Sequence, residues 1–203
     1  MSSSKLRLSD FCSKTFLFLT TFQRRAGRTK MDPAWVRQRL LEIFREQEQR
    51  AQQSPQIYEL YKRASYLLVV TADDIILGAD WEGADGWELL ETELFQSRIG
   101  GTRFFELRKE PVYGGQELLE IFYLCLALGF KGKYYGKGEE ELAEIRQEIY
   151  LSLEGKSEDL ATPITPDAYK ENNQKDFTKM PVVNALRLAI VLLGVALFLA
   201  LGA

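Results

Sequence analysis

The sequence contains no histidine and only two cysteines among its 203 residues. Without histidine, the chain cannot build a Ser-His-Asp or Cys-His nucleophile, a histidine proton shuttle or most catalytic zinc sites. Two cysteines are too few for a disulfide scaffold, which favours a reducing compartment, and we expect Cys12 and Cys125 to be small core residues. The net charge of −3 gives no indication of nucleic-acid binding.

The N-terminal segment lacks the order of a secretory signal. Its apolar stretch, residues 16–19, is short, and the basic cluster of residues 24–30 follows it instead of preceding it. We therefore predict that residues 1–30 form an N-terminal segment containing the first helix of a folded domain. The remainder of that domain is expected over residues 31–154, and residues 155–181 read as a polar tether with Pro163 and Pro166.

The C-terminal run, residues 182–203, has almost no polar side chains. Only Asn184 and Arg187 interrupt it, and nothing after Arg187 is charged. As a helix, this run is about 33 Å long, enough to cross the hydrocarbon core of a bilayer. The sequence predicts a single transmembrane anchor here. Positive charges flank only its N-terminal side, so we expect the large N-terminal domain to lie in the cytoplasm and the C-terminus to lie on the opposite face of the membrane.

Charge is distributed unevenly along the chain. Residues 1–63 hold 13 Lys and Arg against 6 Asp and Glu, a net of +7, whereas the remainder holds 13 against 23, a net of −10. This division predicts either separate basic and acidic faces that meet partners of opposite sign, or ordinary helix surface charge.

Helical spacing of apolar residues predicts an all-α fold. Asp32 and Pro33 form a helix start signal, and the helix they open is expected to stop before Pro55. Further helices are predicted over residues 56–77, 87–96, 115–129 and 139–153. In the helix of residues 87–96, Leu89, Leu90, Leu94 and Phe95 are expected to face inward. The pair at residues 100–101 is expected to break the chain, and Phe122 is expected in the core.

Three stretches resemble chemical sites without meeting their requirements. Asp73 and Asp74 are adjacent, so on a helix their carboxylates point about 100° apart and do not converge on one substrate atom. A calcium loop beginning at Asp80 has Asp85 where glycine is needed. The glycine- and lysine-rich residues 131–138 lack the glycine and the Ser or Thr of a P-loop. We therefore predict no catalytic residue, no cofactor and no metal.

Two clusters of residues resemble signatures of the DotU/TssL (IcmH/DotU) family. The first runs from Asp73-Asp74 through Leu77, Trp81, Trp87, Leu90-Glu91, Leu94-Phe95 and Gly101 to Phe104-Phe105. The second covers residues 118–126 and continues through residues 128–134. Their order and the predicted C-terminal anchor extend the resemblance over nearly the whole chain. The sequence departs from the pattern at Asp74, where many relatives carry Glu, and in having no peptidoglycan-binding extension after the anchor.

The resemblance implies an inner-membrane component of a bacterial type VI secretion system or of its type IVB counterpart. It implies a cytoplasmic, hook-like bundle of about eight helices. The partners it implies are an IcmF/TssM-type inner-membrane protein, cytoplasmic baseplate components of the TssK/TssE type and further copies of the chain itself.

We expect such a protein to anchor the complex and to recruit cytoplasmic machinery. The partner-binding residues that we predict are Asp73, Asp74, Asp80, Trp81, Glu82 and Asp85. There are two alternatives. One is an anchored enzyme using Asp73 and Asp74 or the loop of residues 83–85. The other is a tail-anchored receptor or chaperone unrelated to secretion.

Overall fold

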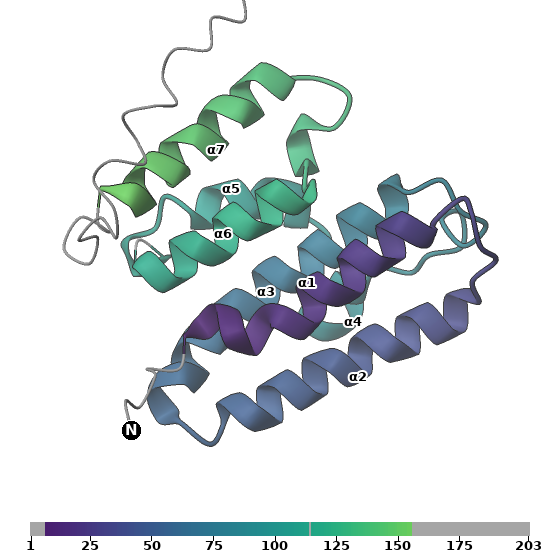
Figure 1. The fold of residues 1–203 in the computed structure, drawn as a ribbon, viewed down its shortest axis with the longest axis horizontal. Helices are drawn as coiled ribbons and strands as arrows, with labels where there is room; N and C mark the ends of the chain where they lie inside the picture. The colour runs from purple at the N-terminus through teal and green to yellow at the C-terminus, as the bar shows by residue number, and fades with distance from the viewer. Residues whose placement is uncertain (1–6, 114, 156–203) are drawn as a thin grey trace, which may run out of the picture. The chain divides into compact units, whose positions relative to one another are not determined.

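Helices make up the regular structure of the described part of the chain, in agreement with the all-α prediction. The computed structural model describes residues 7–113 and 115–155, and Figure 1 shows their arrangement. Seven α-helices and two short 3-10 helices occur within these residues, with no strand among them. The elements are α1 (Leu8–Arg25), α2 (Pro33–Ala51), α3 (Pro55–Gly78), α4 (Leu90–Phe95), α5 (Gly100–Leu107), η1 (Pro111–Tyr113), α6 (Gln116–Leu128), η2 (Gly132–Tyr134) and α7 (Glu139–Glu154).

Helix α3 is the central element of the bundle. It packs against α1, α2, α4, α5 and α6, whereas α7 packs chiefly on α6 (Figure 1). Half of the 24 residues of α3 are buried, including an unbroken run from Leu67 to Asp73. A helix that is buried almost all round needs apolar residues on every side, which explains why this segment lacks a polar stripe.

The helix ends follow the signals in the sequence. The Asp32 side chain accepts a hydrogen bond from the amide of Ala34 at 3.0 Å, and Pro33 occupies the first position of α2. Helix α6 ends at Gly129, which has φ +112°, a left-handed conformation that favours glycine. The predicted helices over residues 56–77, 115–129 and 139–153 are thus confirmed to within two residues at either end.

Three local predictions were wrong: the chain break at residues 100–101, the start of the helix predicted over residues 87–96, and the inward orientation of Leu94. Gly100 and Gly101 do not break the chain but begin α5, and Gly100 is packed so closely that a Cβ atom would lie 2.5 Å from Val70 and 2.6 Å from Glu91. Helix α4 begins at Leu90, three residues later than predicted, because residues 87–89 form an irregular connection. Leu94 faces outward with 42% of its surface exposed.

An aromatic cluster fills the space between α5, α6 and η2. Phe104 lies 4.1 Å from Phe130 and 4.9 Å from Phe122, measured between ring centroids, and Phe105 meets Tyr134 edge-on at 4.8 Å. Phe122 is fully buried, which confirms its predicted core position. Tilted and edge-on ring pairs at these distances add favourable energy to the burial of apolar area.

Both cysteines are buried free thiols, as predicted. No helix within the described residues is both long and apolar enough to cross a membrane. The predicted anchor at residues 182–203 and most of the predicted tether lie outside the described residues.

Replacing Phe122 with Ala is expected to lower the free energy of unfolding by about 3–5 kcal/mol, because the change opens a cavity in the aromatic cluster. Denaturant unfolding followed by circular dichroism measures the loss. The matched change Leu17→Ala, at a side chain that is 68% exposed, should alter stability by no more than about 0.5 kcal/mol. Wild-type stability of the Phe122 variant would show that α6 is not part of the core.

Candidate docking site

Asp73 holds the connection between α3 and α4 in place. Its carboxylate accepts hydrogen bonds from the amides of Leu90 at 2.9 Å and Glu91 at 2.8 Å, and from the Trp87 indole at 2.8 Å. Helix α4 has no side-chain cap of its own, so Asp73 caps it from another helix. The Asp73 residue is only 4% exposed.

Asp74 performs the same task for a second connection. It accepts hydrogen bonds from the amides of Lys131 at 2.8 Å and Gly132 at 3.1 Å, where η2 begins. Gly132 has φ +49° and lies against Gly101, such that a Cβ atom on Gly132 would meet the Gly101 carbonyl oxygen at 2.6 Å. Asp74 therefore fixes a point where the backbone of α5 and the backbone of η2 nearly touch.

Glu91 is a third internal carboxylate, which sequence reasoning did not assign to a cap. It is 4% exposed and accepts hydrogen bonds from the Tyr66 hydroxyl at 2.8 Å and from the amide of Gly100 at 3.1 Å. This places a carboxylate at the first turn of α5, where free amides and the helix dipole favour negative charge. The sequence has no signal for this contact, because only the fold brings Glu91 and Gly100 together.

The adjacent pair on α3 diverges, as the 100° spacing predicted. Asp73 binds the α4 side and Asp74 the η2 side, so the two carboxylates do not meet at one point. Burial raises the pKa of Asp73 and of Asp74 above the ordinary value, while the amide donors oppose this effect by stabilising the charged form. Both carboxylates are structural acceptors between helices, where Asp73 is buried and Asp74 is half-buried.

The remaining predicted partner-binding residues lie on the α3–α4 connection. Asp80, Glu82 and Asp85 are exposed, and Glu82 pairs with Lys30 at 3.4 Å. Trp81 points inward, since its indole donates to the Ile76 carbonyl at 3.0 Å and its ring packs edge-on against Phe22. The structure thus separates the predicted set into inward residues, which are Asp73, Asp74 and Trp81, and exposed acidic residues.

The expectation that Asp73 faces a partner stays a prediction, and the observed burial of its side chain weighs against it. A carboxylate that is 4% exposed and has three hydrogen-bond donors around it presents no free surface for another protein. For the three exposed acidic residues, partner binding stays a prediction.

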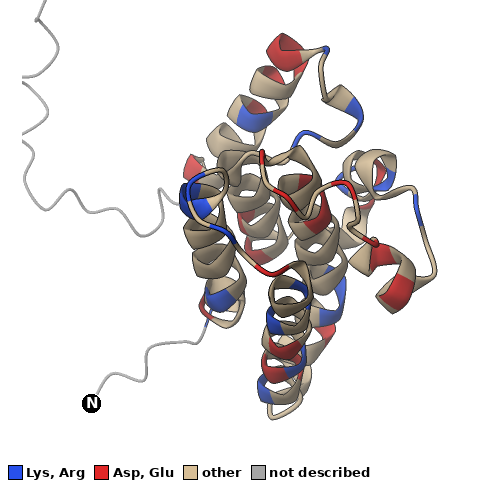
Figure 2. Cartoon of the chain, turned by 90° about the vertical axis from the view of Figure 1, so that its right-hand side faces the viewer, with Lys and Arg blue, Asp and Glu red and all other residues tan. Residues whose placement is uncertain are grey.

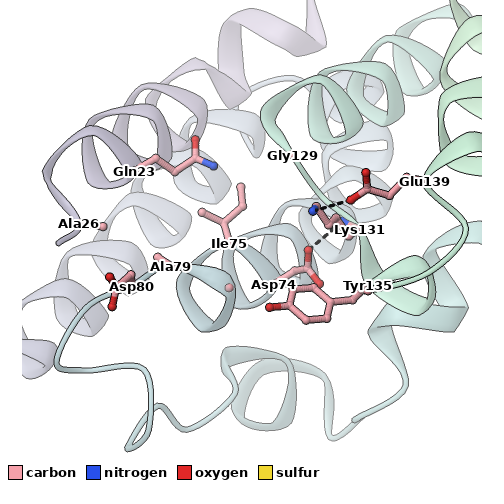
Figure 3. Close-up of a pocket in the computed structure, with 12 residues that line it drawn as sticks. Gln23, Ala26, Asp74, Ile75, Ala79, Asp80, Gly129, Lys131, Tyr135 and Glu139 are labelled. Atoms are coloured by element: carbon pink, nitrogen blue, oxygen red, sulfur yellow. Dashed lines mark hydrogen bonds and ion pairs between the residues drawn. The ribbon is translucent and has the colours of Figure 1, made fainter.

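An open cleft of about 590 Å³ lies beside Asp74, between the end of α1, the end of α3 and the connection from α6 to α7 (Figure 3). Asp80 borders it on one side, and Tyr135 and Glu139 border it on the other. Lys131 extends from the cleft wall to Glu139 at 3.2 Å, and Tyr135 is 64% exposed. The cleft combines charged groups with an accessible aromatic ring, which suits recognition of a protruding peptide segment.

The two cysteines are poorly suited to act as catalytic nucleophiles. Burial raises the pKa of Cys125 to about 12, so its thiol stays protonated and unreactive. Burial likewise raises the pKa of Cys12. Within the same residues, no cluster of three His, Cys, Asp or Glu side chains is placed to hold a metal ion.

The fold and the cleft define a helical scaffold domain whose carboxylates cap its own helices and whose surface offers an open, polar recess. The chain belongs to the DotU family: the model for type VI secretion system protein DotU matches residues 7–203. This confirms the family that the two sequence signatures indicate. The family relates to the membrane complex of type VI secretion.

A solved structure supports the fold assignment. The cytoplasmic domain of TssL from Acinetobacter baumannii has a TM-score of 0.64 and 24% sequence identity to this chain. The match covers 74% of this chain and 99% of that domain, so the two share a fold. A comparison with curated proteins gave no match.

Changing Asp73 to Asn is expected to lower the free energy of unfolding by about 1–3 kcal/mol, because at least one buried N–H loses its acceptor. Charge reversal to Lys should prevent folding, because it buries an ammonium group among N–H donors. Denaturant unfolding checks both. The exposed Asp80→Asn variant is the control and should stay within about 0.5 kcal/mol of the parent; equal stability of Asp73→Asn and the parent would refute the capping role.

Proposed function

We propose that this chain is a structural and docking component of a type VI secretion membrane complex. In this role it anchors the complex in the inner membrane and recruits cytoplasmic baseplate components. The observation that carries the proposal is the family match over residues 7–203, which includes the apolar C-terminal run. An IcmF/TssM-type membrane protein, TssK/TssE-type baseplate components and further copies of the chain are the partners that family resemblance favours.

The placement of the carboxylates supports docking over catalysis. A membrane-anchored enzyme using Asp73 and Asp74 needs both groups on one substrate atom, yet each accepts hydrogen bonds from a different backbone segment. What the surface offers instead is the cleft beside Asp74, with Asp80 exposed at its edge. An acidic edge attracts a basic segment of a partner and speeds its association at low salt.

The cleft variant Asp80→Lys is expected to weaken capture of baseplate components by roughly five-fold, since an attraction of about 0.5 kcal/mol becomes a repulsion of similar size. Co-purification with the full-length chain at low and high salt measures the effect, which should shrink as salt is added. Glu144→Lys on α7 is the matched control, because Glu144 is also exposed but does not line the cleft. Equal losses for both variants, or none for either, would place the docking surface elsewhere.

Removing residues 182–203 is expected to release the protein from the membrane fraction, leave the helical domain folded and abolish secretion. The reason is that an apolar run of 22 residues, whose one charged residue is Arg187, and a polar tether separate anchoring from the bundle. Alkaline extraction of membranes and circular dichroism of the released protein check this. If the truncated protein stays with the membranes as fully as the intact chain, the anchor assignment is wrong.

A further inference from the structure

The outer face of α1 and α2 carries apolar side chains that the bundle leaves exposed. Leu17 is 68% exposed and Trp35 is 52% exposed. The partly buried ring of Phe18 lies 6.3 Å from the Trp35 ring, measured between centroids, and joins the two helices across this face. A Trp that is half exposed beside an exposed Leu is a combination typical of proteins that rest on a membrane surface.

Basic side chains surround these apolar residues. Between Lys14 and Arg39 the sequence holds seven Lys or Arg against one Asp, a net of +6. Arg24, Arg25 and Arg28 are exposed, and within the described residues no ion pair engages them. Figure 2 shows Lys and Arg at the end of α1 and along the α1–α2 connection. We call this combination of Leu17, Phe18, Trp35 and the three arginines the α1–α2 face.

The acidic α3–α4 connection runs beside the basic one and neutralises it only in part (Figure 2). An ion pair between them joins Lys30 to Glu82, whose side chains are 84% and 70% exposed and therefore screened by solvent, and exposed Asp80 borders the same recess as Arg28. The Asp32 carboxylate is occupied as the cap of α2. The arginines of the α1–α2 face thus remain available to an external anion.

We propose that the α1–α2 face binds the surface of the anionic membrane leaflet. Trp35 and Leu17 enter the interface between headgroups and acyl chains, and Arg24, Arg25 and Arg28 meet lipid phosphates. Interfacial binding combines buried apolar area with attraction to anionic lipid, and this face supplies both within one stretch of two helices. The chemistry is that of a lipid surface and not of a buried headgroup pocket, since the side chains involved stand out from the bundle.

This inference rests on the proposed membrane anchor. The 27 residues from 155 to 181 have a maximum reach of roughly 90 Å, longer than a domain of this size is wide, so an anchored chain has length enough to lay any face on the bilayer. Anchoring also raises the effective concentration of the face near lipid, so weak contacts suffice. The outcome is an orientation: the α1–α2 face toward the membrane, and other surfaces toward cytoplasmic partners.

The test uses the full-length chain in lipid nanodiscs of two compositions, phosphatidylcholine alone and phosphatidylcholine with phosphatidylglycerol, each containing brominated acyl chains that quench nearby tryptophan. Trp35 is one of three tryptophans, and Trp35→Phe identifies its share of the emission. We expect strong quenching of Trp35 in the anionic discs, weaker quenching in the neutral discs, and recovery of emission as salt is added. Co-elution of the protein with both kinds of disc measures the membrane anchor separately. A failure of the anchor can therefore be distinguished from a failure of the α1–α2 face to bind lipid.

The charge variant is Arg24→Glu, Arg25→Glu and Arg28→Glu together. Each basic residue near an anionic surface contributes roughly five-fold in affinity, so this variant should bind anionic lipid about a hundredfold more weakly. Its Trp35 should also no longer be quenched in anionic discs. The matched control is Arg98→Glu, Lys109→Glu and Lys137→Glu, an equal charge change at exposed residues outside the α1–α2 face that should leave quenching unchanged. Equal quenching of both variants would overturn the proposal. The proposal would also be overturned if Trp35 were unquenched and the first variant lost a protein partner. That result would make the α1–α2 face a protein-docking surface.

Discussion

The bundle depends on hydrogen bonds between two adjacent carboxylates, one buried and one half-buried, and backbone amides that have no partners in their own helices. Asp73 and Asp74 leave α3 in different directions and bind the connections that lead into α4 and η2. Buried amides without acceptors cost about 1–3 kcal/mol each, so a short helix such as α4 cannot end in the interior without such a cap. Glu91 makes a similar contact at the next helix, because its carboxylate accepts a hydrogen bond from the amide of Gly100 at the start of α5.

Several of the residues that carry the family resemblance therefore serve the interior, although Leu77 and Leu94 are exposed. The two aspartates, Trp87 and Glu91 are parts of one hydrogen-bonded framework, and Gly101 lets the backbones of α5 and η2 approach. Docking depends on what this framework leaves exposed. The cleft beside Asp74 offers an acidic edge, whereas the α1–α2 face is basic and apolar. Surfaces of opposite character suit a protein that connects a membrane to cytoplasmic machinery.

Helix positions and the core were predictable because they follow from local patterns. Asp32 with Pro33 marked the start of α2, Gly129 marked the end of α6, and the apolar spacing around Phe122 marked a buried stripe. The start of α4 and the role of Gly100 were not predictable, because each depends on a hydrogen bond to a carboxylate outside its own helix.

The site was predicted less well, for a physical reason. An acidic residue on a helix looks the same in sequence whether it faces solvent or caps a neighbouring helix, and burial decided the matter for Asp73. The angular argument from helix geometry did hold, since the two aspartates bind separate segments. The exposure of Trp35 and Leu17 was not predictable either. The sequence pattern assigned both residues to helices without showing which apolar side chains the bundle leaves uncovered.

Amide hydrogen exchange of the native full-length chain tests the central role of the two aspartates most directly. Asp73 accepts hydrogen bonds from the amides of Leu90 and Glu91, and Asp74 accepts them from the amides of Lys131 and Gly132. These four amides lie at the starts of short segments, where amides ordinarily exchange fast. The account predicts that all four are protected nearly as strongly as the buried amides of α3. Exchange of these four amides at the rates of exposed loops, with α3 still protected, would contradict it.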